Sequence, residues 1–155
     1  MSARNQIYIC DIDGTIADIS HRLHFIQKRP ADWNGFFAAC VGDSPIPEVI
    51  ETIKLLERGG AYIAMVTGRS SAIQNETEDW LFKHGIVYDC LFMREAGDHR
   101  QDNIVKAELL DKAIAYFKEF GWTPQIAGVF EDRKQVVDMY RSRGLRVFQV
   151  ADGNF

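Results

Sequence analysis

Two aspartates stand one residue apart in the stretch YICDIDGTIAD, directly after an apolar run. Asp11 and Asp13 follow the run from Ile7 to Cys10, and a glycine and a threonine come next. Carboxylates at such short spacing repel and raise each other's pKa unless a cation or a proton neutralises them. A hard divalent cation such as Mg²⁺ prefers oxygen ligands of this kind. The stretch therefore indicates a site for metal-assisted or acid–base chemistry.

Three further groups of reactive residues occur downstream: TGR (Thr67, Gly68, Arg69), Lys106 in DNIVKAELL, and the acidic pair Glu131-Asp132. The Thr67 hydroxyl and the backbone N–H groups of small-residue turns can hold an oxyanion. Lys106 can neutralise negative charge that a metal leaves uncovered. Taken singly, each group is explained by ordinary turn or helix-cap chemistry. Carboxylates, Mg²⁺, an oxyanion cradle and a lysine together are typical of phosphoryl transfer.

The elements that must position these groups alternate between apolar strands and amphipathic helices. The pattern predicts strands at 6–10, 61–66, 87–92, 126–130 and 146–150, and helices at 47–58, 71–84, 103–120 and 133–143. This alternation predicts a Rossmann-like α/β fold, a doubly wound parallel five-stranded sheet with helices on both faces. Ligands of such sheets bind at the carboxyl ends of the strands, where the reactive groups fall. The length of 155 residues fits one domain, 1–155.

The set of DxDGT, TGR, a downstream lysine and an acidic pair resembles the haloacid dehalogenase superfamily of phosphohydrolases over essentially the whole chain. The resemblance implies that the first strand lies at the centre of the sheet. It implies that Asp11 is the nucleophile, forming an aspartyl-phosphate, and that Asp13 is the acid and then the base. Thr67 and Lys106 would bind the transferring phosphoryl group. The implied Mg²⁺ ligands are the Asp11 and Asp132 carboxylates, supported by Glu131 and the backbone carbonyl of Asp13.

A narrower resemblance rests on MREAGDHRQDNIVK and on EDRKQVVDMYRSRGLRVFQVADGNF, which are similar to the 3′-phosphatase half of phage-type polynucleotide kinase/phosphatase. Arg22, eleven residues after Asp11, matches that family's arginine. The predicted substrate-binding residues are Arg22, Arg69, Asp102, Gly68 and His21. Guanidinium groups suit phosphate or ribose oxygens because they bind in bidentate fashion. This chain departs from the pattern in having Glu131 where the family has an aspartate. It also contains no GxxxxGK[ST] motif, so we expect dephosphorylation without kinase activity.

The segment 19–45 is the one stretch between the first two strands that could cover the site, and it has room for two short helices only. We expect a minimal helical cap and an open site, which suits a bulky substrate such as a nucleic-acid end. Basic and aromatic residues are interleaved in this segment, from His21 and Arg22 to Trp33, Phe36 and Phe37. They fit a base-stacking surface, and equally a core or an oligomer contact.

These observations predict a Mg²⁺-dependent phosphomonoesterase that acts on 3′-phosphate ends of polynucleotides or on 3′-nucleotides. One alternative is a 5′-nucleotidase for (deoxy)nucleoside monophosphates, in which a homo-oligomer partner closes the pocket. Another is a phosphate-binding protein without turnover, which the complete set of catalytic residues disfavours. The sequence does not distinguish DNA from RNA, because contacts to a 2′-hydroxyl leave no readable pattern.

The net charge of −4 and the pI near 5.5 argue against binding to nucleic acid or membranes through bulk charge. Three cysteines without CxxC spacing predict reduced thiols rather than a disulfide framework or a zinc site. No stretch is apolar enough for a membrane span or a signal peptide. We therefore expect a soluble, cytoplasmic protein.

Overall fold

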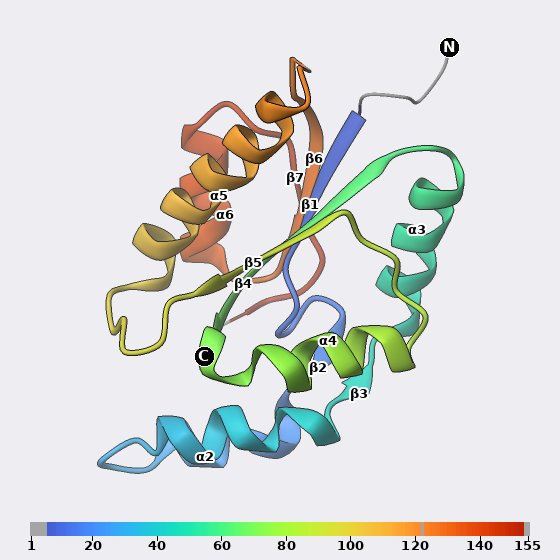
Figure 1. Cartoon of the computed structure of the whole chain (residues 1–155). Coiled ribbons are helices and arrows are strands. Elements are labelled where there is room, and N and C mark those ends of the chain that lie inside the picture. Colours follow the sequence, from blue (N-terminus) through green and yellow to red (C-terminus); the bar gives the residue numbers. More distant parts are fainter. Residues whose placement is uncertain (1–5, 122, 154–155) are drawn as a thin grey trace.

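Five parallel strands form the central sheet in the computed structural model, which describes residues 6–121 and 123–153 (Figure 1). The strand order is β5-β4-β1-β6-β7, so β1 lies at the centre as the sequence predicted. The strands are β1 (Gln6–Cys10), β4 (Tyr62–Ser70), β5 (Cys90–Arg94), β6 (Gln125–Glu131) and β7 (Val147–Gln149). The doubly wound α/β fold is confirmed. The outermost residues of the predicted domain, 1–5 and 154–155, lie outside the described part of the chain.

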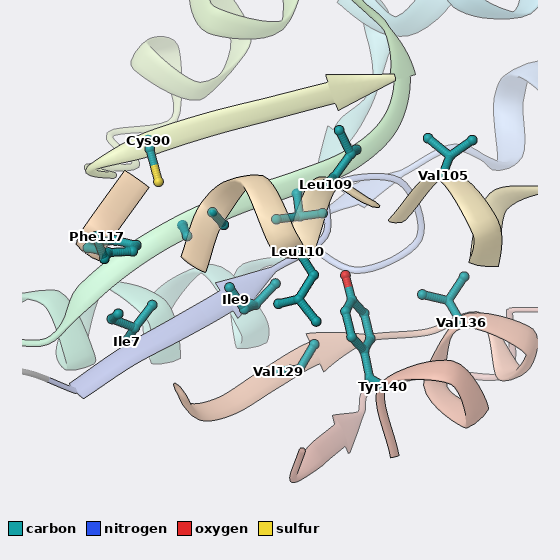
Figure 2. Close-up of a cluster of buried hydrophobic side chains, with 13 residues drawn as sticks. Ile7, Ile9, Cys90, Val105, Leu109, Leu110, Phe117, Val129, Val136 and Tyr140 are labelled. Carbon is teal, nitrogen blue, oxygen red and sulfur yellow. The ribbon is translucent and has the colours of Figure 1, made fainter. Parts of the chain in front are cut away.

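Helices cover both faces of this sheet. On one face lie α3 (Pro47–Arg58) and α4 (Gln74–Lys83), and on the other α5 (Asp102–Glu119) and α6 (Lys134–Ser142). Each face of the sheet has its own hydrophobic core. Figure 2 shows the core on the side of α5 and α6, where Ile7 and Ile9 of β1 lie with Leu109 and Leu110 of α5 and Tyr140 of α6. None of the helices in the described ranges is both long and apolar enough to cross a membrane.

The apolar sequence of β1 follows from burial on both faces. Ile7 and Ile9 pack into the core under α5, whereas Cys10 and the partly buried Tyr8 pack into the core under α3 and α4. Side chains alternate across a strand, and here both alternating sets are covered by helices. A near-continuous apolar run therefore ends at the carboxyl edge, where Asp11 begins the loop.

Two strand boundaries differ from the prediction by three residues or more. β4 continues through Thr67, Gly68 and Arg69 to Ser70, with a register shift against β5 between Thr67 and Ser70. β5 begins at Cys90 rather than at position 87, since the Asp89 carboxylate accepts the backbone N–H of Ile63 at 2.8 Å just before the strand. The TGR motif thus lies in an irregular strand end, and not in a loop after it.

The insert between β1 and α3 is small and mostly helical, as predicted. It contains the 3₁₀ turns η1 (Ser20–Arg22) and η2 (Ala39–Gly42) and the helices α1 (His24–Gln27) and α2 (Trp33–Ala38). Its ends are joined by a two-stranded antiparallel pair of β2 (Ala17–Asp18) and β3 (Ser44–Pro45), which the sequence pattern did not predict. This pairing holds α2 below the carboxyl edge of the sheet (Figure 1).

Candidate active site

One pocket of about 380 Å³ collects most of the predicted site residues at the carboxyl edge of the sheet. Asp11 and Asp13 reach it from the end of β1, and Gly68 from the end of β4. The remaining predicted residues that line it are Asp102 and Lys106 of α5 and the acidic pair Glu131 and Asp132 after β6. The topology thus brings together groups that are more than a hundred residues apart in the sequence, from Asp11 to Asp132.

Four carboxylates gather around Lys106, and we call these five residues the acidic cluster: Asp11, Asp102, Lys106, Glu131 and Asp132. The Lys106 Nζ lies 2.8 Å from Glu131 Oε2, 3.0 Å from Asp11 Oδ1 and 3.5 Å from Asp102 Oδ2. Lys106 is only 2% exposed. This ammonium can offset only part of the negative charge that surrounds it.

The excess of negative charge shifts the pKa values of the residues in the cluster. Burial raises the pKa of Asp11 well above its ordinary value, and the neighbouring Glu131 raises it further. Burial, with the charge of Asp11, raises the pKa of Asp132 to about 7. For Lys106, burial alone would lower the pKa, but the surrounding carboxylates outweigh it and raise the pKa. The cluster therefore favours binding either protons or a cation.

A divalent cation fits this donor set. Carboxylate oxygens of Asp11, Glu131 and Asp132 lie within 4.8 Å of one another, and all three residues are buried. The Thr15 hydroxyl bridges two of them, donating to Asp11 Oδ2 and Asp132 Oδ1 at 3.3 Å each. Carboxylate oxygens suit Mg²⁺, which usually binds one or two of them and keeps several waters. The donor chemistry thus agrees with the predicted cofactor.

Glu131 differs from the other two carboxylates because both of its oxygens already accept hydrogen bonds. Oε1 accepts the backbone N–H groups of Asp132 and Arg133 at 3.1 Å each, and Oε2 accepts Lys106 Nζ at 2.8 Å. The Asp11 carboxylate contacts Lys106 and Thr15, and the Asp132 carboxylate contacts Thr15, so these two have fewer hydrogen bonds to exchange for a cation than Glu131 has. Gly14 lets Asp132 approach, since it has a φ of +79° and a Cβ there would lie 2.2 Å from Asp132 Oδ2.

Asp13 lies in a second group of charges, the arginine cluster of Asp13, Arg22, Asp43 and Arg69. Arg22 donates from Nε and Nη2 to the two oxygens of Asp43, at 2.7 Å each, and from Nη2 to Asp13 Oδ1 at 2.8 Å. Arg69 donates from Nε to Asp13 Oδ1 and from Nη2 to Asp43 Oδ2, both at 2.7 Å. Two carboxylates and two guanidinium groups thus balance one another.

This balance sets the protonation of Asp13. Burial alone would raise the pKa of Asp13, but the charges and hydrogen bonds of Arg69 and Arg22 outweigh it and lower the pKa. In the free protein Asp13 is therefore ionised at neutral pH. The acid role that the resemblance implies needs a proton that this resting state does not hold.

Arg22, Arg69 and His21 were predicted to bind substrate, but the structure places them against carboxylates. Both arginines are buried, and His21 Nε2 lies 2.8 Å from Asp43 Oδ1. Asp13 is among the described residues that line the pocket, and none of these three basic residues is. Arg22 and Arg69 contact Asp13 and Asp43, and His21 contacts Asp43. Their role in substrate binding stays a prediction.

Thr67 and Gly68 have different surroundings within one motif. The Thr67 hydroxyl is buried and accepts the backbone N–H of Arg69 at 3.1 Å, whereas Gly68 lines the pocket. A Cβ on Gly68 would lie 2.4 Å from Asp102 Oδ1, so glycine is required for the start of α5 to approach. Arg94 links Gly68 to Asp102, since it donates to the Gly68 carbonyl and to Asp102 Oδ1 at 2.9 Å each.

Sequence reasoning missed two residues that the structure brings into the site. Asp43 is 4% exposed and holds both arginines of its cluster, and Thr15 is fully buried between two carboxylates. Thr15 belongs to the DxDGT motif, so the motif itself could have indicated it. Asp43 stands in GDSP, a stretch that reads as an ordinary turn, and no local pattern marks it.

The fold and the site define a chain of the haloacid dehalogenase superfamily of phosphatases. Its structure is similar to that of the class C acid phosphatase from Bacillus anthracis with tungstate bound, at a TM-score of 0.67 and 14% identity over 98% of this chain and 69% of the other. Within this class, residues 5–155 match the family described as polynucleotide kinase PNKP phosphatase domain. The chain belongs to that family.

Two structures with higher identity are of Pnkp1/Rnl/Hen1 complexes. The chain is 30% identical to one in the structure of the Pnkp1/Rnl/Hen1 complex, with a TM-score of 0.77 over 100% of this chain and 49% of that one. It is 31% identical to one in the structure of the Pnkp1/Rnl/Hen1 RNA repair complex, with a TM-score of 0.76 over 100% and 45%. This chain thus spans about half of the length of those proteins.

Proposed function

We propose that this chain is a Mg²⁺-dependent phosphomonoesterase that removes 3′-phosphates from polynucleotide or nucleotide ends through an aspartyl-phosphate on Asp11. The observation that carries the proposal is the separation of two neighbouring carboxylates into opposite charge environments. Asp11 lies in the acidic cluster and Asp13 in the arginine cluster, and both line one pocket. A nucleophilic carboxylate must be ionised and an acid must carry a proton. These roles therefore require a cation at Asp11, whose pKa is raised in the free protein, and a bound phosphate beside Asp13, whose pKa is lowered.

Asp11 and Asp132 would hold Mg²⁺, supported by Glu131 and by the backbone carbonyl of Asp13. When bound, Mg²⁺ supplies charge neutralisation for the carboxylates and for the transferring phosphoryl oxygens. Glu131 already receives Lys106 and two backbone N–H groups, so its role is to hold Lys106 beside Asp11. Lys106 then faces the phosphoryl group with its position fixed from three sides.

In the first step the Asp11 carboxylate oxygen attacks phosphorus, and the bond from phosphorus to the ester oxygen breaks. Asp13 gives its proton to that leaving oxygen. In the second step Asp13 takes a proton from water as the water oxygen attacks phosphorus, which releases inorganic phosphate and restores the Asp11 carboxylate. Arg22 and Arg69 hold Asp13 by Oδ1, which fixes the direction in which this proton moves.

The proton on Asp13 has a physical source in the substrate. A phosphate monoester brings negative charge into the pocket beside Asp13, and a nearby like charge raises the pKa of a carboxylate. We infer that Asp13 becomes protonated as the phosphate binds, although the arginines keep it ionised in the free protein. The arginine cluster thus positions Asp13 and limits protonation to the occupied site.

The 3′-phosphate substrate is supported by the family and by the shape of the site. The matching family is a polynucleotide kinase phosphatase domain, and the two structures at about 30% identity are of Pnkp1/Rnl/Hen1 complexes, one of which is described as an RNA repair complex. The insert that could cover the pocket holds only short helices, which leaves room for a nucleic-acid end. A role in nucleic-acid end repair follows as part of this proposal.

A substrate panel with Mg²⁺ tests the proposal. We expect phosphate release from 3′-phosphorylated oligonucleotides and 3′-nucleotides to exceed release from the matched 5′-phosphates. Asp11→Asn should abolish turnover, whereas the exposed Asp138→Asn on α6 serves as the control and should keep it. Preference for 5′-mononucleotides would instead support a 5′-nucleotidase, and turnover by Asp11→Asn would contradict the proposed nucleophile.

A further inference from the structure

The mouth of the pocket has an aromatic wall that the proposed chemistry does not use. Helix α2 contributes Trp33, Phe36 and Phe37 to the pocket lining. Phe36 is 3% exposed and belongs to the interior, whereas Trp33 is 49% exposed. A large apolar ring that faces the pocket and is half open to solvent is available to a ligand.

The Trp33 ring is held by its neighbours on the same helix. Its centroid lies 5.9 Å from that of Phe36 in an edge-on arrangement, and 6.1 Å from that of Phe37. Asp32 caps the start of the helix, and its carboxylate accepts the backbone N–H of Gly35 at 2.8 Å. These contacts present the indole as a supported platform.

The aromatic wall is also tied to the residue proposed as the acid. The Arg22 guanidinium lies 4.2 Å from the centre of the Phe36 ring and donates to the Phe36 carbonyl at 3.2 Å. The same guanidinium donates to Asp13 Oδ1. A group that binds against Trp33 would therefore lie at a fixed position relative to the reacting phosphate.

The loop between β5 and α5 also lines the pocket, and its arginines Arg94 and Arg100 already have partners. Arg100 donates to both oxygens of Asp98 and of Glu108, at distances between 2.7 and 3.2 Å. Arg94 donates to the Asp98 and Arg100 carbonyls, at 3.2 and 2.7 Å. These two guanidinium groups stabilise the loop, so the loop is poorly suited to binding a run of backbone phosphates.

We propose that Trp33 is the stacking platform for the nucleobase of the nucleotide whose phosphate is removed. This inference rests on the proposed function and names the part of the substrate that the pocket recognises beyond the phosphate. Stacking tolerates any base, because every base has a π face. The site thus selects a nucleotide end over other phosphate esters without selecting a sequence.

Kinetics with two substrates test the platform. The substrates are a nucleoside 3′-phosphate and the same sugar 3-phosphate without a base. In Trp33→Ala, the ratio of their kcat/KM values should fall by about 5-fold or more, and Trp33→Phe should restore most of it. Phe82→Ala, which removes an aromatic ring 87% exposed on α4 and outside the pocket lining, should keep the wild-type ratio. An unchanged ratio in Trp33→Ala would overturn the platform.

A binding measurement separates this inference from the proposed catalysis. The nucleoside 3′-phosphate is titrated into Asp11→Asn protein, and tryptophan fluorescence is followed. We expect quenching that saturates with the nucleotide, is absent with the base-free sugar phosphate, and is lost when Trp33→Phe is added. Quenching that persists without Trp33, or no quenching at all, would contradict the platform. Wild-type protein that fails to hydrolyse either ester would count against the proposed function, and the fluorescence result would still decide the inference.

Discussion

The acidic cluster and the arginine cluster lie at the same edge of the sheet, and they shift the pKa of an aspartate in opposite directions. Asp11 shares its surroundings with three further carboxylates and Lys106, and its pKa is raised. Asp13 shares its surroundings with Asp43 and two arginines, and its pKa is lowered. β1 ends at Cys10, so the two aspartates lie beyond the strand. Their partners, rather than strand alternation, decide where each side chain points.

The comparison teaches how two aspartates in one motif can acquire separate chemical roles. An unbalanced cluster gains stability when a cation binds, whereas a balanced cluster already has its counter-charges in place. The first is therefore suited to hold Mg²⁺ and the second to orient a single proton carrier. Substitutions in the two clusters should therefore differ in what they reduce: the catalytic rate, the free energy of unfolding, or the response of stability to pH and metal.

After the loss of turnover expected for Asp11→Asn, the largest expected effect is on catalysis by Asp13→Asn. This change keeps the shape of the side chain but removes the proton carrier, so we expect a loss of about 10²- to 10⁴-fold in kcat for alkyl phosphates. The loss should be much smaller for aryl phosphates with good leaving groups, because these need little protonation. Steady-state kinetics over a series of leaving groups measures this. Equal losses across the series would contradict the acid role.

The next effect is on stability, from Asp43→Asn. Removing this buried carboxylate leaves Arg22 and Arg69 without their shared counter-charge, which should lower the free energy of unfolding by about 3–5 kcal/mol. Denaturant unfolding in urea measures it. The exposed Asp111→Asn, which loses a surface ion pair to Arg143, should cost less than about 1 kcal/mol and serves as the control. A similar cost for both variants would mean that the arginine cluster is not the balanced unit described above.

The third effect is the dependence of protein stability on pH and on bound metal. Asp132 has a pKa of about 7 in the folded protein and an ordinary value of 3.8 in the unfolded chain, so the folded state binds more protons between these values. Metal-free protein should therefore become more stable as pH falls from about 7 to about 5, and less stable as it rises. The lowered pKa of Asp13 acts in the other direction, but only below its ordinary value of 3.8.

Mg²⁺ should reverse this dependence because it binds the ionised carboxylates. At about 100 times its Kd it should add about 2.7 kcal/mol to the free energy of unfolding, with the largest gain at high pH. Thermal unfolding with and without Mg²⁺ at several pH values measures both effects, and Asp132→Asn should weaken the response to the metal. Stability that rises with pH in the absence of metal would contradict the unbalanced acidic cluster.

The smallest effect concerns Tyr140 of α6, next to the acidic cluster. Among the buried side-chain nitrogen and oxygen atoms of the described residues, its hydroxyl is the one found without a hydrogen-bond partner. Tyr140→Phe removes that group and keeps the ring in the core, so stability should be unchanged or rise by up to about 1 kcal/mol. Urea unfolding measures it. A clear loss would show that the hydroxyl interacts with the cluster in solution.

The sequence predicted the fold well because its signals are local. The apolar runs at β1 and β4 and the helix patterns of α3 and α6 depend on burial that repeats along the chain. The extension of β4 to Ser70 and the pairing of β2 with β3 were missed, because they depend on partners distant in sequence.

Most of the predicted site residues line the pocket for a related reason. Motifs at the ends of parallel strands must meet at one edge, so Asp11 and Asp132 could be placed together. The direction of Arg22 and Arg69 could not be predicted, since it depends on the buried Asp43. A residue whose role is to balance charge leaves no pattern of its own in the sequence.

The most direct test of the division between Asp11 and Asp13 is to trap the phosphorylated protein. Asp13→Asn protein is mixed with an aryl phosphate and Mg²⁺, quenched in acid, digested and examined by mass spectrometry. Because the leaving group needs no proton while hydrolysis of the intermediate needs a base, we expect one phosphoryl group on Asp11, absent from the Asp11→Asn variant. Two results would contradict the account. One is a phosphoryl group on Asp13 when the wild-type protein is treated in the same way, and the other is burst kinetics without any phosphorylated peptide.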